Sequence, residues 1–158
     1  MSRARIDMAK NAPASYAALG TLAAAAESEA KDSGLESALI DLVKIRASQL
    51  NGCAFCLRMH TREAVAGGMG SDRLAVLPAW RESQYFSTVE QAALSIAEAI
   101  TFISAQILDD SLYDSARRHL DDRQIAAIVW VTIAINGFNR VAISSHYHVG
   151  PEVGHVSD

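Results

Sequence analysis

The sequence predicts an all-α fold, and three observations lead to that prediction. Alanine, leucine, glutamate and arginine, which favour helices, are abundant among the 158 residues. Alternating runs of β-branched residues, which mark strands, are missing. Apolar residues recur instead at helical spacing, as at Leu35, Leu39, Leu42 and Val43. Because a chain of this length usually forms one domain, we assign residues 1–158 to a single domain of six or seven helices.

Proline and glycine bound the first three predicted helices. Pro13 suits the first turn of a helix and opens the first one. Gly34 breaks the chain before the second helix, and Asn51-Gly52 is a turn signal before the third. The predicted ranges are about 13–31, 35–50 and 53–67.

Capping residues mark most of the later helices. A short helix is expected to stop at Pro78. Ser87 and Glu90 have the spacing of a capping box, which opens the next helix. Aspartates precede the last two helices and are expected to cap them. The predicted ranges are about 71–77, 88–103, 110–120 and 123–145.

Charge and hydropathy narrow the choice of partners. The net charge of −4 and the pI of about 5.7 give no basic surface, so we expect neither nucleic acid nor a membrane as a partner. The stretch Ile125–Ile135 is apolar nearly all round, which is typical of a helix buried in a core or against another subunit. Together with the slightly positive mean hydropathy of +0.10, it predicts a homo-oligomer.

The start of the chain has some features of a secretory signal. Basic residues precede an alanine-rich stretch over 17–26, but alanine replaces the usual leucine, and Pro13 interrupts the approach. The longest apolar run, Ile125–Ile135, falls short of the ~20 residues that span a bilayer. We therefore expect a cytoplasmic protein. In a reducing compartment, two cysteines close together indicate redox or metal chemistry rather than a structural disulfide.

The strongest chemical signal is the segment Cys53-Ala54-Phe55-Cys56-Leu57-Arg58-Met59-His60. In a helix, Cys53, Cys56 and His60 would fall within an arc of roughly 60° and share one face. The positive end of a helix stabilises a thiolate, which is the nucleophilic form of cysteine. An imidazole one turn further can carry a proton near neutral pH, and two thiols at this spacing can form a disulfide.

Other readings of these residues stay open. Two cysteines and a histidine could supply three of the four ligands that a zinc site needs, but no fourth lies nearby in sequence. Alternatively, both cysteines are buried in the core and have no chemical role. His146, His148 and His155 form a second candidate metal group near the end of the chain.

From these residues the sequence resembles the alkylhydroperoxidase D-like branch of the carboxymuconolactone decarboxylase family. The resemblance is carried by 42–56 running into Met59-His60, and continues through Trp80-Arg81-Glu82, the segment 90–101 and 136–140. It implies an AhpD-like all-helical fold, assembly as trimers or hexamers, and thiol-dependent peroxidase activity. The redox core would then span about 35–105.

The resemblance also implies roles for particular residues. In that family a carboxylate twelve residues before the first cysteine joins a proton relay with the second cysteine and the histidine, and the matching position here is Asp41. Because aspartate is one methylene shorter than the family's usual glutamate, we expect it to act through a water, with Ser48 extending the relay. Glu36 is a second carboxylate candidate. The family's best-studied peroxidases carry a histidine before the second cysteine, where this chain has Phe55.

We therefore predict an antioxidant peroxidase with Cys56, Cys53, His60 and Asp41 as catalytic residues and with no cofactor. Cys56 would attack a hydroperoxide, Cys53 would close the disulfide, and a separate dithiol reductant protein would reopen it. Arg46 and Arg58 are candidates for stabilising a thiolate. Two alternatives are a non-enzymatic oligomer with a disulfide switch, and a lactone enzyme of the carboxymuconolactone decarboxylase type; the paired cysteines count against the latter.

Overall fold

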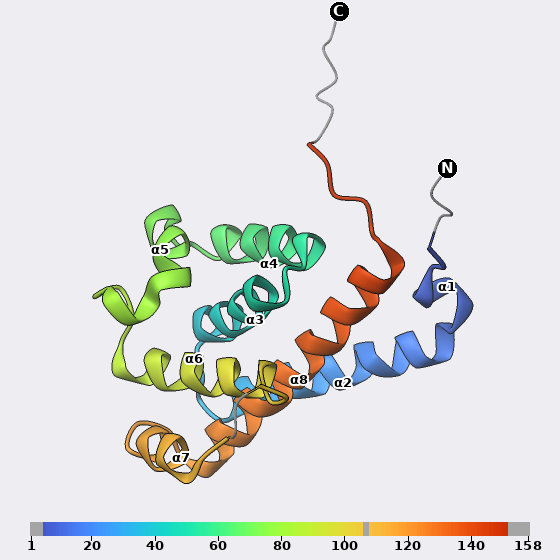
Figure 1. Cartoon of the computed structure of the whole chain (residues 1–158). Helices are drawn as coiled ribbons and strands as arrows, with labels where there is room; N and C mark the ends of the chain where they lie inside the picture. Colours follow the sequence, from blue (N-terminus) through green and yellow to red (C-terminus); the bar gives the residue numbers. More distant parts are fainter. Residues whose placement is uncertain (1–4, 106–107, 152–158) are drawn as a thin grey trace, which may run out of the picture.

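The computed structural model describes residues 5–105 and 108–151, and every regular element in them is a helix (Figure 1). The elements are α1 (Met8–Asn11), α2 (Pro13–Asp32), α3 (Ser37–Asn51), α4 (Ala54–Ala66), α5 (Ser71–Val76), the 3-10 helix η1 (Leu77–Glu82), α6 (Thr88–Thr101), α7 (Asp110–Arg117) and α8 (Asp122–Ser145). The all-α prediction is confirmed, but the predicted count of six or seven is wrong, since eight α-helices lie in the described residues. The additional helix, α1, has four residues and is too short to show a periodic pattern.

Most predicted helix boundaries agree with the structure because the sequence signals act locally. Pro13 lies in the first turn of α2. The capping box before α6 is complete: the Glu90 backbone N–H donates to Ser87 Oγ, and the Ser87 N–H donates to the Glu90 carboxylate at 2.9 Å. The short helix predicted to stop at Pro78 is α5, which ends at Val76, and Pro78 lies in the first turn of the 3-10 helix η1 that follows.

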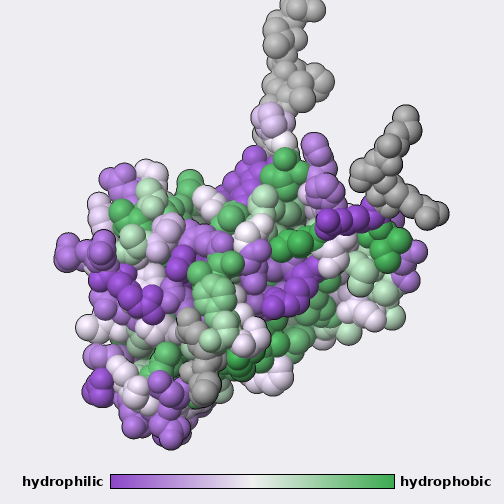
Figure 2. All heavy atoms as spheres, viewed as in Figure 1, coloured by the Kyte–Doolittle hydropathy of each residue, from purple (hydrophilic) through white to green (hydrophobic). Residues whose placement is uncertain are grey.

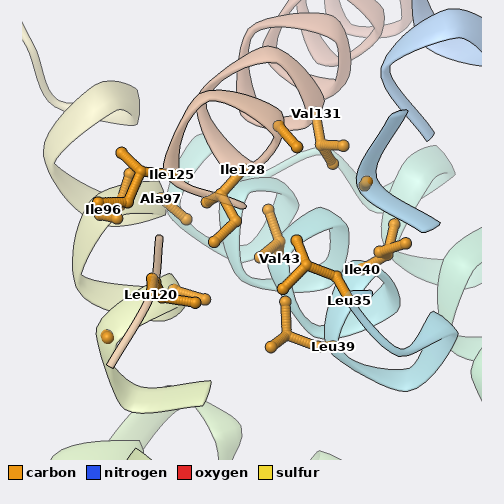
Figure 3. Packing of buried hydrophobic residues seen from close by; sticks show 14 of the residues in the cluster. Leu35, Leu39, Ile40, Val43, Ile96, Ala97, Leu120, Ile125, Ile128 and Val131 are labelled. Atoms are coloured by element: carbon orange, nitrogen blue, oxygen red, sulfur yellow. The ribbon is translucent and has the colours of Figure 1, made fainter. Parts of the chain in front are cut away.

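The main core forms where α2, α3, α6 and α8 meet. Figure 3 shows residues of α3, α6 and α8 pointing toward one another, among them Val43, Ile96 and Ile128. Helix α8 runs through the molecule and packs against the other three (Figure 1). Its contact with α2 is close at Gly137, where a Cβ atom would lie 2.9 Å from Leu19 Cδ1. A larger residue at this position would therefore require the Leu19 side chain to shift.

Helix α8 has two different sides. Ile125, Ile128 and Val131 are buried, whereas the side chains of Trp130 and Ile133 are 46% and 39% exposed. By length and composition α8 is the one helix of the described residues that could cross a membrane, yet half of its most apolar stretch is buried inside the protein. Core helices pass the same test. Elsewhere the surface mixes both kinds of side chain, and the face in Figure 2 carries hydrophobic patches between hydrophilic ones.

The two ends of the described chain lie together beside α8. Arg5 donates to the Ile143 carbonyl at 2.8 Å, and the Met8 N–H donates to Ser145 Oγ at 3.0 Å. Beyond α8, the tail crosses to α4, where Arg58 donates to the Gly150 carbonyl at 3.1 Å. These contacts bring both chain ends next to the junction between α3 and α4, where the cysteines lie.

Candidate active site

The two cysteines lie at the junction of α3 and α4. Gly52 ends α3 in the left-handed region, with φ of 66°, so that α4 can begin almost at once. Cys53 is the N-cap of α4, and its sulfur accepts the backbone N–H of Cys56 at 3.4 Å. Cys53 therefore precedes the helix, whereas Cys56 and His60 lie one turn apart on its buried face. We predicted that Cys53, Cys56 and His60 share one helix face, and the structure shows this only for Cys56 and His60.

Both thiols are free and buried, with exposed fractions of 1% for Cys53 and 2% for Cys56. The pKa of the Cys56 thiol is raised to about 12, mainly by burial and further by a hydrogen bond with the neighbouring Cys53 thiol. A hydrogen bond from the Asn139 amide pulls this pKa down, but by less. Cys56 is thus protonated at neutral pH, so a base has to remove its proton before it can act as a nucleophile.

Cys56 opens into a cavity of about 580 Å³ between α2, α3, α4 and α8. We call it the Cys56 cavity. Its walls are mostly apolar and aromatic, with Phe138 and Tyr16 packed edge to face at 5.8 Å. His60 and Asp41 line the same cavity. The structure therefore brings three of the four predicted catalytic residues together around one space, and Cys53 lies outside it.

The nearest partner of His60 is Glu63, a residue that the sequence analysis missed. His60 Nδ1 lies 2.7 Å from Glu63 Oε2, one turn along α4. Because a carboxylate accepts hydrogen bonds, it holds the ring proton on Nδ1 and leaves Nε2 free to take a proton. Residues three apart in a helix are neighbours, so the sequence spacing carried this signal.

Asp41 lies in the Cys56 cavity without a hydrogen bond or ion pair to any residue that the structure describes. Burial raises the pKa of Asp41; Lys44 opposes this, while the carboxylates of Glu63 and Glu27 reinforce it. Lys44 itself is held by Glu27 at 2.5 Å. Asp41 is thus a partly buried carboxyl group that gains a proton more readily than usual.

A hydrogen-bonded network behind Cys56 joins α3 to α8. Asn139, which is fully buried, donates to Ser48 Oγ at 3.0 Å and accepts from Asn51 at 2.8 Å. Ser48 in turn donates to the Lys44 carbonyl at 2.8 Å. Ser48 therefore belongs to this network and not to the predicted relay with Asp41. Asn139 is a second residue that the sequence analysis left without a chemical role.

The predicted accessory residues have partners or positions other than the proposed contact with a thiolate. Arg46 pairs with Glu98 at 2.8 Å, Arg58 holds the tail, and Glu36 precedes α3 without capping it through its side chain. Among the described residues, no group of three or more His, Cys, Asp or Glu side chains is placed to hold a metal ion. His155, part of the second candidate metal group, lies outside the described residues.

Comparison with known proteins identifies the class. Residues 13–99 match the carboxymuconolactone decarboxylase family, and the chain belongs to this family. A Bacillus subtilis protein, the uncharacterized YdfG, is 40% identical over 118 residues, which cover 75% of this chain and 80% of the relative. The uncharacterized YnjA of Escherichia coli is 30% identical over 100 residues, or 63% of this chain and 54% of the relative.

Solved structures show the same fold. A crystal structure from Agrobacterium tumefaciens, of a protein of unknown function assigned provisionally as the antioxidant defence protein AhpD, is 34% identical; it covers 95% of this chain and 100% of its own, with a TM-score of 0.84. The debrominase Bmp8 aligns with a TM-score of 0.77 at 20% identity, over 90% of this chain and 74% of its own. The fold is therefore AhpD-like, and it also occurs in a debrominase.

Proposed function

We propose that this protein is a thiol-dependent peroxidase that reduces hydroperoxides through a Cys53/Cys56 dithiol–disulfide cycle, as part of antioxidant defence in the cytoplasm. One observation carries the proposal: Cys56 opens into a cavity that also contains an imidazole and a carboxyl group, while a second thiol lies within hydrogen-bonding reach of its sulfur. This arrangement supplies a nucleophile, a proton carrier and a resolving thiol in one place.

The cycle begins when His60 takes the proton from Cys56. The thiolate attacks the outer peroxide oxygen, the O–O bond breaks, and the departing alkoxide takes the proton from His60 and leaves as an alcohol. Cys56 is then a sulfenic acid, and the peroxide has been reduced by two electrons. The Cys53 sulfur attacks the Cys56 sulfur, a disulfide forms, and the sulfenic oxygen leaves as water. A dithiol donor protein returns two electrons and two protons.

His60 has a defined task in this scheme because the pKa of Cys56 is so high. At pH 7 a thiol with a pKa of about 12 is almost entirely protonated, so unaided attack would be slow. General base catalysis typically contributes 10²–10⁴-fold. In this proposal Asp41, which lines the same cavity and has no hydrogen-bond partner among the described residues, exchanges protons with His60 through solvent.

The competing functions make different use of the same residues. The debrominase relative has the fold, at an identity that supports no inference about its substrate here. A redox switch would form the disulfide without turning over a peroxide. A lactone decarboxylase would need neither thiol. Dependence on both cysteines and on a dithiol donor therefore separates the peroxidase from these alternatives.

The proposal includes a homo-oligomer, a trimer or a hexamer. Trp130 and Ile133 lie one turn apart on the exposed side of α8 and leave an apolar surface uncovered in one chain. We expect light scattering to give a mass well above the 16.9 kDa of one chain. Trp130→Glu should reduce that mass without unfolding the protein. A monomer at all concentrations would contradict this part of the proposal.

The central experiment combines thiol titration with turnover. One equivalent of cumene hydroperoxide should remove both free thiols and give an intramolecular disulfide, seen by mass spectrometry as a loss of two hydrogens. With dithiothreitol present, hydroperoxide should be consumed catalytically, and Cys56→Ser should abolish this. Disulfide formation without turnover, with dithiothreitol or a protein dithiol, would support the redox switch instead. Thiols that stay free would reject both.

A further inference from the structure

The two thiols open into different cavities. Cys56 lines the Cys56 cavity, which does not include Cys53. Cys53 lines a second cavity of about 530 Å³, which does not include Cys56. This second space, the Cys53 cavity, lies between the start of α4, the end of α8 and the tail beyond α8. A molecule in one cavity therefore lies beside one cysteine of the pair and not the other.

A thin wall separates the two cavities. Phe55, Ala142 and Tyr147 border both of them. The rings of Phe55 and Tyr147 pack edge to face with centroids 5.1 Å apart. Phe55 lies between the cysteines in the chain, so the same residue that spaces the two thiols also forms part of the wall.

The two cavities differ in charge. The Cys56 cavity is lined by three carboxyl groups, those of Glu27, Asp41 and Glu63, and by one lysine, Lys44, which pairs with Glu27. Among the described residues that line the Cys53 cavity, none is acidic, and Arg5, His146 and His148 are present. The excess of carboxyl groups in the Cys56 cavity disfavours a thiolate, whereas the Arg5 guanidinium in the Cys53 cavity attracts one. Attack on a disulfide requires a thiolate, so the second cavity suits an incoming thiol donor.

We propose that the disulfide is reduced from the side of the Cys53 cavity, whereas the hydroperoxide reaches Cys56 from the Cys56 cavity. This inference rests on the proposed dithiol cycle and assigns its two substrates to separate entrances. The donor is a dithiol whose first sulfur enters as a thiolate between the start of α4 and the tail. The hydroperoxide and the dithiol donor then do not compete for one cavity.

The chemical step balances. The donor thiolate attacks the Cys53 sulfur, the Cys53–Cys56 bond breaks, and Cys56 leaves and takes up a proton. Cys53 is now joined to the donor. The donor's second thiolate attacks its own first sulfur, Cys53 leaves as a thiolate, and the donor departs as a cyclic disulfide, having given up two electrons. The Cys56 backbone N–H, which already donates to the Cys53 sulfur at 3.4 Å, stabilises this second leaving group.

The test uses one alanine from each cavity. Ala54 is exposed, lines only the Cys53 cavity and lies in the first turn of α4, while Ala23 of α2 is partly exposed and lines only the Cys56 cavity. Ala54→Trp should fill the Cys53 cavity, and Ala23→Trp should fill the Cys56 cavity. The disulfide is prepared with diamide, and its reduction by dithiothreitol is followed by stopped flow. Oxidation of the reduced protein by cumene hydroperoxide is followed separately.

We expect Ala54→Trp to slow reduction at least about tenfold, or roughly 1.4 kcal/mol, and to leave oxidation within about twofold of the wild type. Ala23→Trp should do the reverse. Reduction at the wild-type rate in Ala54→Trp, or slower reduction in Ala23→Trp, would overturn the inference. Ala54→Leu serves if the tryptophan variant does not fold. Because diamide makes the disulfide, a failure of hydroperoxide to oxidise the protein would reject the proposed peroxidase without affecting this test.

Discussion

Glu98 of α6 is buried and Asp41 of α3 is partly buried, and the surroundings of the two carboxyl groups differ. Glu98 accepts hydrogen bonds from Trp80 at 2.9 Å, from Arg46 at 2.8 Å and from Arg81 at 2.5 Å. Burial alone would raise the pKa of Glu98, but these three donors together lower it. Asp41 has no such donor among the described residues, and burial raises its pKa.

The difference separates a carboxylate that holds the fold together from one that can take part in chemistry. Glu98 ties α6 to α3 and to η1, and its charge is permanently compensated. Asp41 shares a cavity with a thiol and an imidazole and has a pKa shifted toward the neutral range. Perturbed groups of the second kind are typical of functional sites. Changes at the two positions should therefore alter different properties.

The largest effect is expected at Glu98. Glu98→Ala leaves the Arg46 guanidinium partly buried and uncompensated, and breaking such a pair costs about 3–5 kcal/mol. Urea unfolding should show this loss, while the folded fraction should still be oxidised by hydroperoxide at the wild-type rate. Asp41→Ala is the matched control and should change the free energy of unfolding by less than about 1 kcal/mol. Equal losses in the two variants would show that Asp41 supports the fold as much as Glu98 does.

The next largest effect concerns the thiols. Only Cys56 shares a cavity with His60, so Cys56→Ser should slow oxidation by at least about 100-fold, or roughly 2.7 kcal/mol. In Cys53→Ser, Cys56 should be trapped as a sulfenic acid by dimedone, because no resolving thiol remains. The helix dipole favours the opposite assignment, since Cys53 is nearer the N-terminus of α4. Strong trapping of Cys53 in Cys56→Ser would make Cys53 the attacking thiol.

What the sequence could predict is what short-range interactions determine. Pro13, Ser87 with Glu90, and Asp121 set helix starts through contacts within a few residues, and the structure agrees with each. The pairing of Cys56 with His60 is equally local, because one helical turn separates them.

The parts that could not be predicted depend on a single dihedral angle or on distant segments. The left-handed conformation of Gly52 makes Cys53 a cap instead of a helical residue, and the two cysteines line different cavities. Asn139 reaches Cys56 only because α8 packs against α3, which no local pattern encodes. Glu63, in contrast, could have been predicted from the sequence, since it lies three residues after His60 in the same helix.

A smaller effect is expected at Glu63, a positioning residue for His60. Glu63→Ala removes the acceptor on Nδ1, and because Glu63 is solvent-exposed we expect a loss of about tenfold in the oxidation rate, or roughly 1.4 kcal/mol. ¹⁵N NMR of the imidazole should show the proton on Nδ1 in the wild type and a mixture of tautomers in Glu63→Ala. Glu63→Gln, which keeps an acceptor oxygen, should restore most of both properties. An unchanged tautomer with a reduced rate would contradict the positioning role.

The smallest effect is the pH dependence of stability, where the two carboxylates should act in opposite directions. The folded pKa of Glu98 lies below its ordinary value of 4.5, so the folded state binds fewer protons than the unfolded state in that window. Its contribution to stability is present above about pH 4.5 and is lost as the pH falls through the folded pKa. The folded pKa of Asp41 lies above its ordinary value of 3.8, so the folded state binds more protons, and stability falls as the pH rises through that window. Urea unfolding should therefore show that the wild type loses stability between pH 7 and pH 3, and that this loss is absent in Glu98→Gln.

Asp41→Asn should be slightly more stable than the wild type near pH 7, by well under about 1 kcal/mol. If Asp41→Asn were instead destabilised at pH 7 and not at pH 3, Asp41 would be a paired carboxylate like Glu98, and its proposed role in proton exchange would fail.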